Sequence, residues 1–464
     1  MRKLAAPLMA VLVSACMIGP DYQRPPIDAP AAWRLSEQGA KDLANSAWWE
    51  QFNDPALNTL VATALRENKD LMIASARIEE FAGRLGITRS QLYPQVGLGV
   101  DASRQRVTLP GSSANGTYNS YDVLLGASWE IDLWGRIRRE SEAARARLMS
   151  TEEGKQGVVL TLVADVAGSY INLRDLDRQL EIAVNTANAR EASYKIFQDR
   201  YTGGVISLLE LNQNKSQYEE ALATIPKFEK GIAQQENALS VLLGRNPGPI
   251  VRGNNIDQLR VPAVPEGLPS TLLERRPDVR GAEQDLIARN ALIGAAKAAY
   301  FPSISLTALF GVASSSLSSL FSSGSQAWQY GGALSQPIFT GGLLAGQVEV
   351  AEAQQQQSLF AYQKTVQNAF REVNDALIDI DRTRAQLAAQ RLQVQSLQVY
   401  ADTARLRYDN GYTSYIEVLD AERSLFNAQL QYTQTQQTQL QASINLYKAM
   451  GGGWVTEAAK LTTK

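Results

Sequence analysis

Histidine is absent from the 464-residue sequence, and cysteine occurs once, at position 16. Without histidine the chain lacks the commonest metal ligand and the commonest general base, which disfavours most metalloenzymes and catalytic triads. A single cysteine excludes an internal disulfide. The 45 basic and 47 acidic residues leave a formal net charge of −2, so there is no basic footprint for nucleic acid. We therefore expect no enzyme active site, no cofactor, no metal site and no nucleic-acid partner.

Proline is missing from two long stretches, 136–202 and 343–410. Because a helix rises 1.5 Å per residue, either stretch would extend roughly 100 Å if it stayed helical. That length is several times the width of an ordinary domain. The sequence therefore predicts two unusually long helices.

Each long stretch ends in the motif R-Y-x-x-G-x-x-S-x-x-E, which begins at Arg200 and again, 207 residues later, at Arg407. We interpret each copy as a helix end, a glycine in the left-handed conformation and a serine that opens the next helix. Apolar positions before the motif recur at the same offset, with the alternating spacing of four and three that packed helices require. A unit of roughly two hundred residues is therefore written twice.

The only cysteine follows a segment that looks like a secretory signal. A basic start, Met1–Lys3, precedes the apolar run Leu4–Val13, which is too short to span a bilayer as a helix. Val13-Ser14-Ala15-Cys16 then stands where a cleavage site belongs. The arrangement resembles a bacterial lipoprotein signal, in which the cysteine is acylated, and Met17 after it implies sorting to the outer membrane. An ordinary secretory signal with an incidental cysteine is the alternative.

Aromatic residues are dense in the following leader, at Trp48-Trp49 and Phe52, which predicts that this segment packs against the folded body. The stretch Leu57 to Leu92 is typical of one helix. Its first turns carry apolar residues on one face, at Leu57, Leu60, Val61, Ala64 and Leu65.

After Pro94 and Pro302 the apolar period changes from 3.6 to 2, which predicts four strands near 94–104, 120–133, 302–313 and 328–340. One face of each strand is apolar and the other is polar. The apolar positions are Val96, Leu98, Val100, Ala102, Tyr121, Val123, Leu125, Ala127, Trp129, Ile131, Leu133, Ile304, Leu306, Ala308, Phe310, Val312, Trp328, Tyr330, Leu334 and Ile338.

Strands of about ten residues with this alternation fit a transmembrane β-barrel, and a soluble sheet with one buried face is the alternative. The outer-membrane address favours the barrel. Four strands are too few to close one, and an open sheet edge cannot exist in lipid. We therefore expect the chain to oligomerise to build a pore.

Taken together, these features resemble the TolC family of outer-membrane efflux channels, in its lipoprotein branch, over essentially the whole chain. The residues that carry the resemblance are Val13–Cys16, Trp48-Trp49, Asn53-Asp54-Pro55, Tyr93-Pro94, Phe301-Pro302, Asp132-Leu133-Trp134-Gly135-Arg136, the two R-Y-x-x-G turns and Leu419-Asp420-Ala421-Glu422-Arg423. The resemblance implies an α+β membrane protein with an internal tandem duplication. Three chains would form a homotrimeric 12-stranded β-barrel, four strands each, continued by a long periplasmic α-helical barrel.

The resemblance also implies how the chain is divided. It gives a signal peptide (1–15), a lipidated leader (16–56), a first repeat (57–250), a linker (251–269), a second repeat (270–450) and a C-terminal tail (451–464). The leader, linker and tail would form an equatorial region.

The repeats differ one to two turns after the motif. Helical spacing places Ile416, Asp420 and Arg423 on one face, whereas the first repeat has Leu209, Gln213 and Ser216. A ring of charges is a normal way to tune a pore, and a solvated i, i+3 ion pair is the simpler alternative. The resemblance implies that Asp420 lines a periplasmic gate.

The resemblance assigns two further gate positions. Tyr408 would link helices near the closed end, and Glu417 stands where some members have a second acid. Thr413 occupies a position where some members carry a linking arginine. The hairpin ends would contact a periplasmic adaptor protein, although any tight turn needs glycines equally. These end residues are Gly203, Gly204, Val205, Ser207, Gly411, Tyr412 and Ser414.

The function implied is a passive conduit in the outer membrane, lipid-anchored at Cys16 and surrounded by outer-membrane lipid. It would export drugs or other small toxic compounds received from an inner-membrane RND-type pump through the adaptor. Metal-ion export and type I protein secretion by the same fold stay open as alternatives. A coiled-coil spacer or adhesin is an alternative from another class, but it would not need four amphipathic strands.

Overall fold

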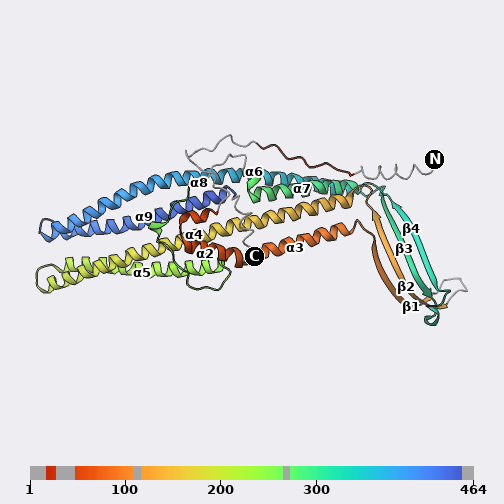
Figure 1. Cartoon of the computed structure of the whole chain (residues 1–464), viewed down its shortest axis with the longest axis horizontal. Helices are drawn as coiled ribbons and strands as arrows, with labels where there is room; N and C mark the ends of the chain where they lie inside the picture. The colour runs from red at the N-terminus through yellow and green to blue at the C-terminus, as the bar shows by residue number, and fades with distance from the viewer. Residues whose placement is uncertain (1–16, 28–46, 108–115, 265–271, 452–464) are drawn as a thin grey trace. The chain divides into compact units, whose positions relative to one another are not determined.

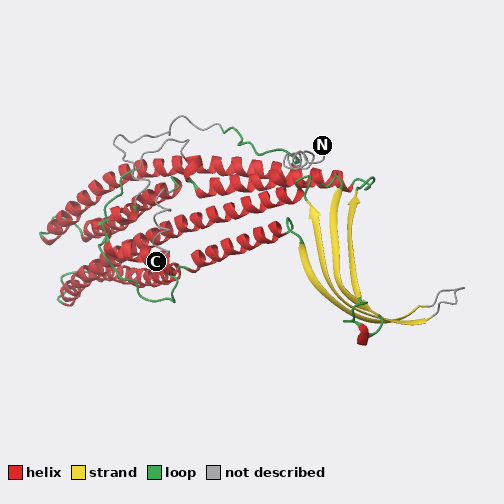
Figure 2. Ribbon diagram, turned by 45° about the vertical axis from the view of Figure 1, so that its right-hand side comes forward, coloured by secondary structure: helices red, strands yellow, loops and turns green. Residues whose placement is uncertain are grey.

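The computed structural model describes residues 17–27, 47–107, 116–264 and 272–451. The predicted signal peptide, Cys16 and the tail after 451 lie outside the described residues. The elements, drawn in Figures 1 and 2, are η1 (Trp48–Phe52), α2 (Pro55–Glu67), α3 (Lys69–Ser90), β1 (Gln95–Val107), β2 (Gly116–Ile131), α4 (Arg136–Thr202), α5 (Leu208–Leu242), η2 (Ile256–Gln258), α6 (Leu272–Arg275), α7 (Pro277–Ala298), β3 (Ser303–Ser314), η4 (Leu317–Ser319), β4 (Gln326–Ser335), α8 (Leu343–Asp409) and α9 (Tyr415–Ala449).

The helices confirm the internal duplication. The helices α4 and α8 each have 67 residues, α5 and α9 each have 35, and α3 and α7 each have 22. The start of α8 at Leu343 follows the start of α4 at Arg136 by 207 residues, which is the offset between the two sequence motifs. Two copies of one helix–strand–strand–helix–helix unit therefore follow one another along the chain.

The chain forms two compact units. Among the described residues, the sheet unit contains the four strands and the helix ends nearest to them, within Ala76–Glu152 and Gly281–Lys364, together with residues 17–27. The helical unit contains the other described parts of the helices, within residues 47–75, 153–264, 272–280 and 365–451.

The four described strands belong to one antiparallel sheet in the order β1-β2-β3-β4 (Figure 1). The register sets Val100 opposite Val123, and Val123 in turn opposite Val312. Because directly opposed residues lie on the same face, the predicted apolar positions within the strands form one continuous apolar face. This face is open in the single chain, where Val100 is 70% exposed and Trp328 is 68% exposed.

Two expectations about element boundaries are wrong. The predicted helix from Leu57 to Leu92 is broken at Asn68, whose ψ of 133° is extended. Its side chain accepts a hydrogen bond from the N–H of Leu71 and donates one to the carbonyl of Leu242, so it ends α2 and caps α3. The fourth strand stops at Ser335, before Pro337, which has no N–H for the ladder.

The aromatic leader packs as predicted into the core of the helical unit. Trp48 and Phe52 are completely buried, and the Trp48 ring stacks on Tyr447 of α9 with centroids 5.3 Å apart. The apolar face of α2 enters the same core. An 18-residue window of α4 is apolar enough to cross a membrane by composition, but 61% of it is buried inside the fold, so it supplies core surface.

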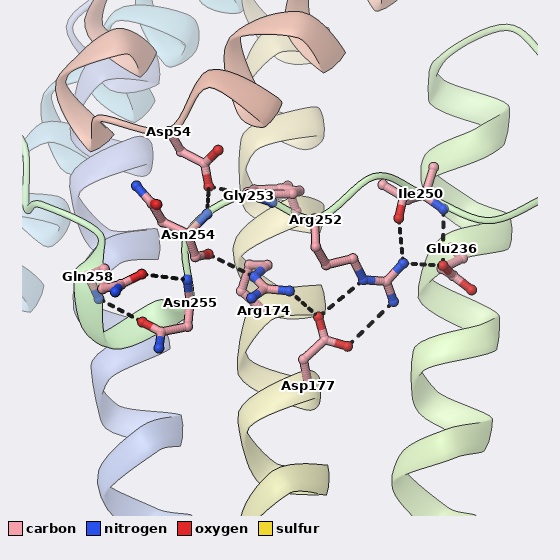
Figure 3. Close-up of polar contacts among 11 residues, drawn as sticks. Asp54, Arg174, Asp177, Glu236, Ile250, Arg252, Gly253, Asn254, Asn255 and Gln258 are labelled. Carbon is pink, nitrogen blue, oxygen red and sulfur yellow. Dashed lines mark hydrogen bonds and ion pairs between the residues drawn. The ribbon is translucent and has the colours of Figure 1, made fainter.

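Residues 248–258, which follow α5, form a segment that we call the strap, and polar contacts hold it against the helical unit (Figure 3). The buried carboxylate of Asp54 accepts hydrogen bonds from the hydroxyl of Tyr170, at 2.8 Å, and from the N–H of Asn254, at 3.0 Å. Two residues before Asn254, the side chain of Arg252 forms ion pairs with Asp177 on α4 and with Glu236 on α5. The strap therefore ties the leader to α4 and α5.

Replacing Gly253 tests this strap. A Cβ atom at Gly253 would lie 2.0 Å from Oδ1 of Asp54, so Gly253→Ala must displace the carboxylate from its partners. We expect the variant to lose about 3 kcal/mol of stability, the cost of disrupting buried charged hydrogen bonds. Thermal melting of the detergent-solubilised protein, followed by circular dichroism, measures the loss. Gly248→Ala in the same strap is the control, because its nearest neighbouring atom would be 4.0 Å away. Equal melting of the two variants would contradict the account.

Candidate functional site: the helix-hairpin ends

Both helix hairpins of the helical unit end in the same turn. The motif glycines Gly204 and Gly411 have φ angles of +73° and +75°, the left-handed conformation predicted for them. The N–H of the residue after each glycine donates to the carbonyl of the motif arginine at 2.8 Å. Together with the hydrogen bond from the N–H of each glycine to the carbonyl of the motif tyrosine, at 2.9 Å, this bond closes the ends of α4 and α8 in a Schellman arrangement.

The two serines after the turns act differently. Ser207 caps α5 in a capping box with Glu210, whereas the side chain of Ser414 makes no cap hydrogen bond to α9. At the second turn the carboxylate of Glu417 instead accepts a hydrogen bond from the hydroxyl of Thr413 and pairs with Arg407 at 3.4 Å. Glu417 therefore stabilises the second turn.

Apolar side chains are exposed at both ends. Val205 is 75% exposed and Leu209 is 67% exposed at the first hairpin end, and Tyr412 is 77% exposed at the second. Ile416 is also 63% exposed on α9. The hairpin ends thus present apolar surface that the described residues leave exposed.

Three aromatic rings join the two hairpins just behind these ends. Phe197 of α4 is completely buried. The centroid of its ring lies 4.3 Å from that of the Tyr415 ring and 6.0 Å from that of the Tyr408 ring. Burial raises the pKa values of the Tyr408 and Tyr415 hydroxyls, so both stay neutral at physiological pH. Within one chain, the ring of Tyr408 on α8 therefore contacts α4 of the other repeat.

A polar network surrounds the rings. The buried amide of Asn214 donates to Ser193 Oγ at 3.0 Å and to the hydroxyl of Tyr415. Arg405 of α8 donates to the same serine at 3.2 Å and lies 3.7 Å from Glu422, whose pKa is raised by burial. The network adds hydrogen bonds between α4 and α5 on one side and α8 and α9 on the other.

The other predicted gate residues lie on an exposed face of α9. Asp420 accepts a hydrogen bond from Arg423 at 3.0 Å, and their side chains are 53% and 56% exposed. Within one chain this is the i, i+3 surface pair that the sequence left open. Any contact of Asp420 across a pore must come from another copy.

The sequence analysis gave no role to Phe197, Ser193, Asn214 or Arg405, and it included Glu422 only as a member of the motif at 419–423. Only the apolar spacing of α4 could have marked Phe197. Asn214 could have been found from the repeat, because its equivalent is Ala421. The other three are polar residues on helices, and helical periodicity does not distinguish a buried polar residue from a solvated one.

The polar face of the sheet contains a second arrangement that the sequence did not indicate. Asp101 of β1 lies directly opposite Asp122 of β2. Like charges opposed in neighbouring strands repel each other, so this pair disfavours the sheet. Among the described residues there is no group of three or more acidic, cysteine or histidine residues that could hold a metal ion.

The sheet has one apolar and one polar face, and it is attached to helices of 67 residues. This combination is typical of outer-membrane channels with a long periplasmic helical part. The outer membrane efflux protein family matches the chain at residues 60–245 and 268–452. The chain belongs to this family. It is an outer-membrane efflux channel with the fold of the family's trimers, four strands to a chain.

Individual relatives match over nearly their whole length. The toluene efflux pump outer membrane protein TtgF of Pseudomonas putida is 38% identical over 460 residues, covering 96% of both chains. The cation efflux system protein CusC of Escherichia coli K12 is 37% identical, covering 97% of this chain and 99% of the relative. The open MtrE outer membrane channel of Neisseria gonorrhoeae has a TM-score of 0.84 at 32% identity, covering 95% of this chain and 99% of that structure.

Proposed function

We propose that three copies of this chain form the outer-membrane conduit through which an efflux pump exports small toxic organic compounds. The observation that carries the proposal is the open, amphipathic four-stranded sheet, which needs further copies to close a pore. Relatives of similar identity are named for efflux of toluene and of antibiotics. Other relatives are named for cation efflux, so cations are the second candidate substrate.

The pump would be of the RND type and would reach the conduit through a periplasmic adaptor. The exposed apolar side chains of Val205, Leu209 and Tyr412 at the hairpin ends are the surface that supports adaptor contact. The strap of Figure 3 supports an equatorial region built on the leader and linker, because it ties both to α4 and α5.

Deleting the chain from its host tests the substrate class. We expect the deletion to lower the concentrations of organic solvents and antibiotics that stop growth, because these compounds would accumulate without an exit. Growth inhibition by metal salts should change little. Re-expression of the intact chain should restore resistance. A strain sensitised to metal salts alone would instead identify the chain as a cation exporter, and unchanged growth in all media would contradict an efflux role.

The anchor at Cys16 is also a proposal, supported by the residues that follow it. The N–H of Ile18 donates to the carbonyl of Trp134 at 3.2 Å, and the almost fully buried Arg139 donates to the carbonyls of Ile18 and Gly19. The segment after Cys16 is therefore fixed where β2 leads into α4. Ile18 and Gly19 therefore lie beside the ends of the strands.

Replacing Cys16 should abolish acyl labelling but leave the protein able to insert. The strands bury far more apolar surface in a membrane than a single acylated residue does. Cys16→Ala, made with a cleavable secretory signal, should therefore still be extracted from outer membranes only by detergent, and as a trimer. A variant that was wholly soluble and monomeric would contradict an integral barrel.

The gate assignment predicts an asymmetry between the repeats. Losing one charged hydrogen bond costs about 1.5–3 kcal/mol, and a trimer loses three such bonds at once. We therefore expect Asp420→Ala with Tyr408→Phe to raise single-channel conductance and to weaken block by multivalent cations. The Phe side chain keeps the ring stacked on Phe197, so only the hydroxyl is removed.

The matched control changes the equivalent residues of the first repeat, Gln213→Ala with Tyr201→Phe. Its effect on conductance should be much smaller, because no charge is lost. Equal effects of the two double variants would place the gate elsewhere and leave Asp420 and Arg423 as a surface pair.

A further inference from the structure

The internal repeat contains information about the two outer edges of the sheet. The strands β1 and β2 come from the first repeat and β3 and β4 from the second, so the β2–β3 pairing is a contact between repeats. A contact of the same kind, from β4 onward to the next repeat, requires the β1 strand of another copy.

The two hairpins show how equivalent residues are related. Gln95 pairs with Ser128 in the first hairpin, and Ser303 pairs with Ser335 in the second. Gln95 and Ser303 are 208 positions apart in the sequence, and Ser128 and Ser335 are 207 positions apart. The same offsets relate the starts of α3 and α7 and of α4 and α8, respectively. Every residue of β1 and β2 thus has a defined equivalent in the second repeat.

Applied to the β2–β3 pairing, these offsets give the register between copies. Ala127 opposite Ala308 becomes Leu334 opposite Val100. We propose that β4 of one copy pairs antiparallel with β1 of the next in this register, an inference that rests on the trimeric assembly and adds its seam. The opposed pairs, β4 residue first, are Leu334–Val100, Gly332–Ala102, Tyr330–Arg104 and Trp328–Arg106.

The proposed register keeps the apolar face continuous across the seam. Val100 and Leu334 both lie on the apolar face of the single chain and are 70% and 69% exposed there. A shift by one residue would set the apolar face of one copy beside the polar face of its neighbour, and lipid would then meet polar side chains. The seam covers edges that would otherwise leave backbone groups unpaired in hydrocarbon.

The register also predicts a specific contact at the end of the seam that contains Trp328 and Tyr330. Trp328 and Tyr330 are stacked with ring centroids 5.7 Å apart and are 68% and 78% exposed. The register places Arg106 and Arg104 of the next copy opposite these rings. A guanidinium beside an aromatic face forms a cation–π contact, so each seam would carry two of them.

Cysteine pairs test the register in the full-length protein. Leu334→Cys with Val100→Cys should give covalent dimers and trimers on denaturing gels after treatment with a short thiol crosslinker. The pair cannot link within one chain, because three strand spacings of about 4.8 Å separate β4 from β1. Tyr330→Cys with Arg104→Cys should behave alike at the far end of the seam.

The matched control is Leu334→Cys with Arg104→Cys, which the register separates by four residues, about 13 Å along the strand. Faster linkage of this control than of the Leu334–Val100 pair would overturn the register while leaving the trimer intact. Failure of every cysteine pair, with trimers still captured by an amine crosslinker, would mean that the edges meet in some other way. If the amine crosslinker captured only monomers, the proposed assembly would fail as well.

Discussion

The structure depends on one requirement, that every backbone N–H and C=O in hydrocarbon must find a protein partner. The four strands satisfy this requirement among themselves but leave the outer edges of β1 and β4 open. The same strands expose an apolar face that water disfavours. The isolated sheet is therefore unfavourable both in water and in lipid. We therefore expect copies of the chain to associate when the sheet enters the membrane.

The duplication supplies a scaffold, and the differences between its halves supply the candidate functions. Equal helix lengths bring two similar turns, at Gly204 and Gly411, to equivalent ends of the hairpins. Around these turns the repeats diverge. The capping box of the first turn is replaced at the second by the contacts of Glu417, and the Asp420–Arg423 pair occurs only in the second repeat. Asn214, where the second repeat has alanine, helps to join the two hairpins.

Local patterns predicted most of the fold because their causes are local. Alternation of apolar residues identified the strands and their shared face, and the glycine motif identified the hairpin ends. The break at Asn68 was missed because the residues on both sides favour a helix, and a hydrogen bond to the carbonyl of Leu242 decides the outcome. The site was predicted less well. Contacts such as Asn214 with Tyr415 join residues 201 positions apart, and periodicity marks apolar residues only.

The central claim is that copies of this chain close their sheets into one continuous pore. Recording from planar bilayers tests it most directly, using trimeric and monomeric fractions of the purified protein separately. The account predicts discrete conductance steps from the trimeric fraction and none from the monomeric fraction. A trimer without conductance, or a monomer that conducts equally well, would contradict it.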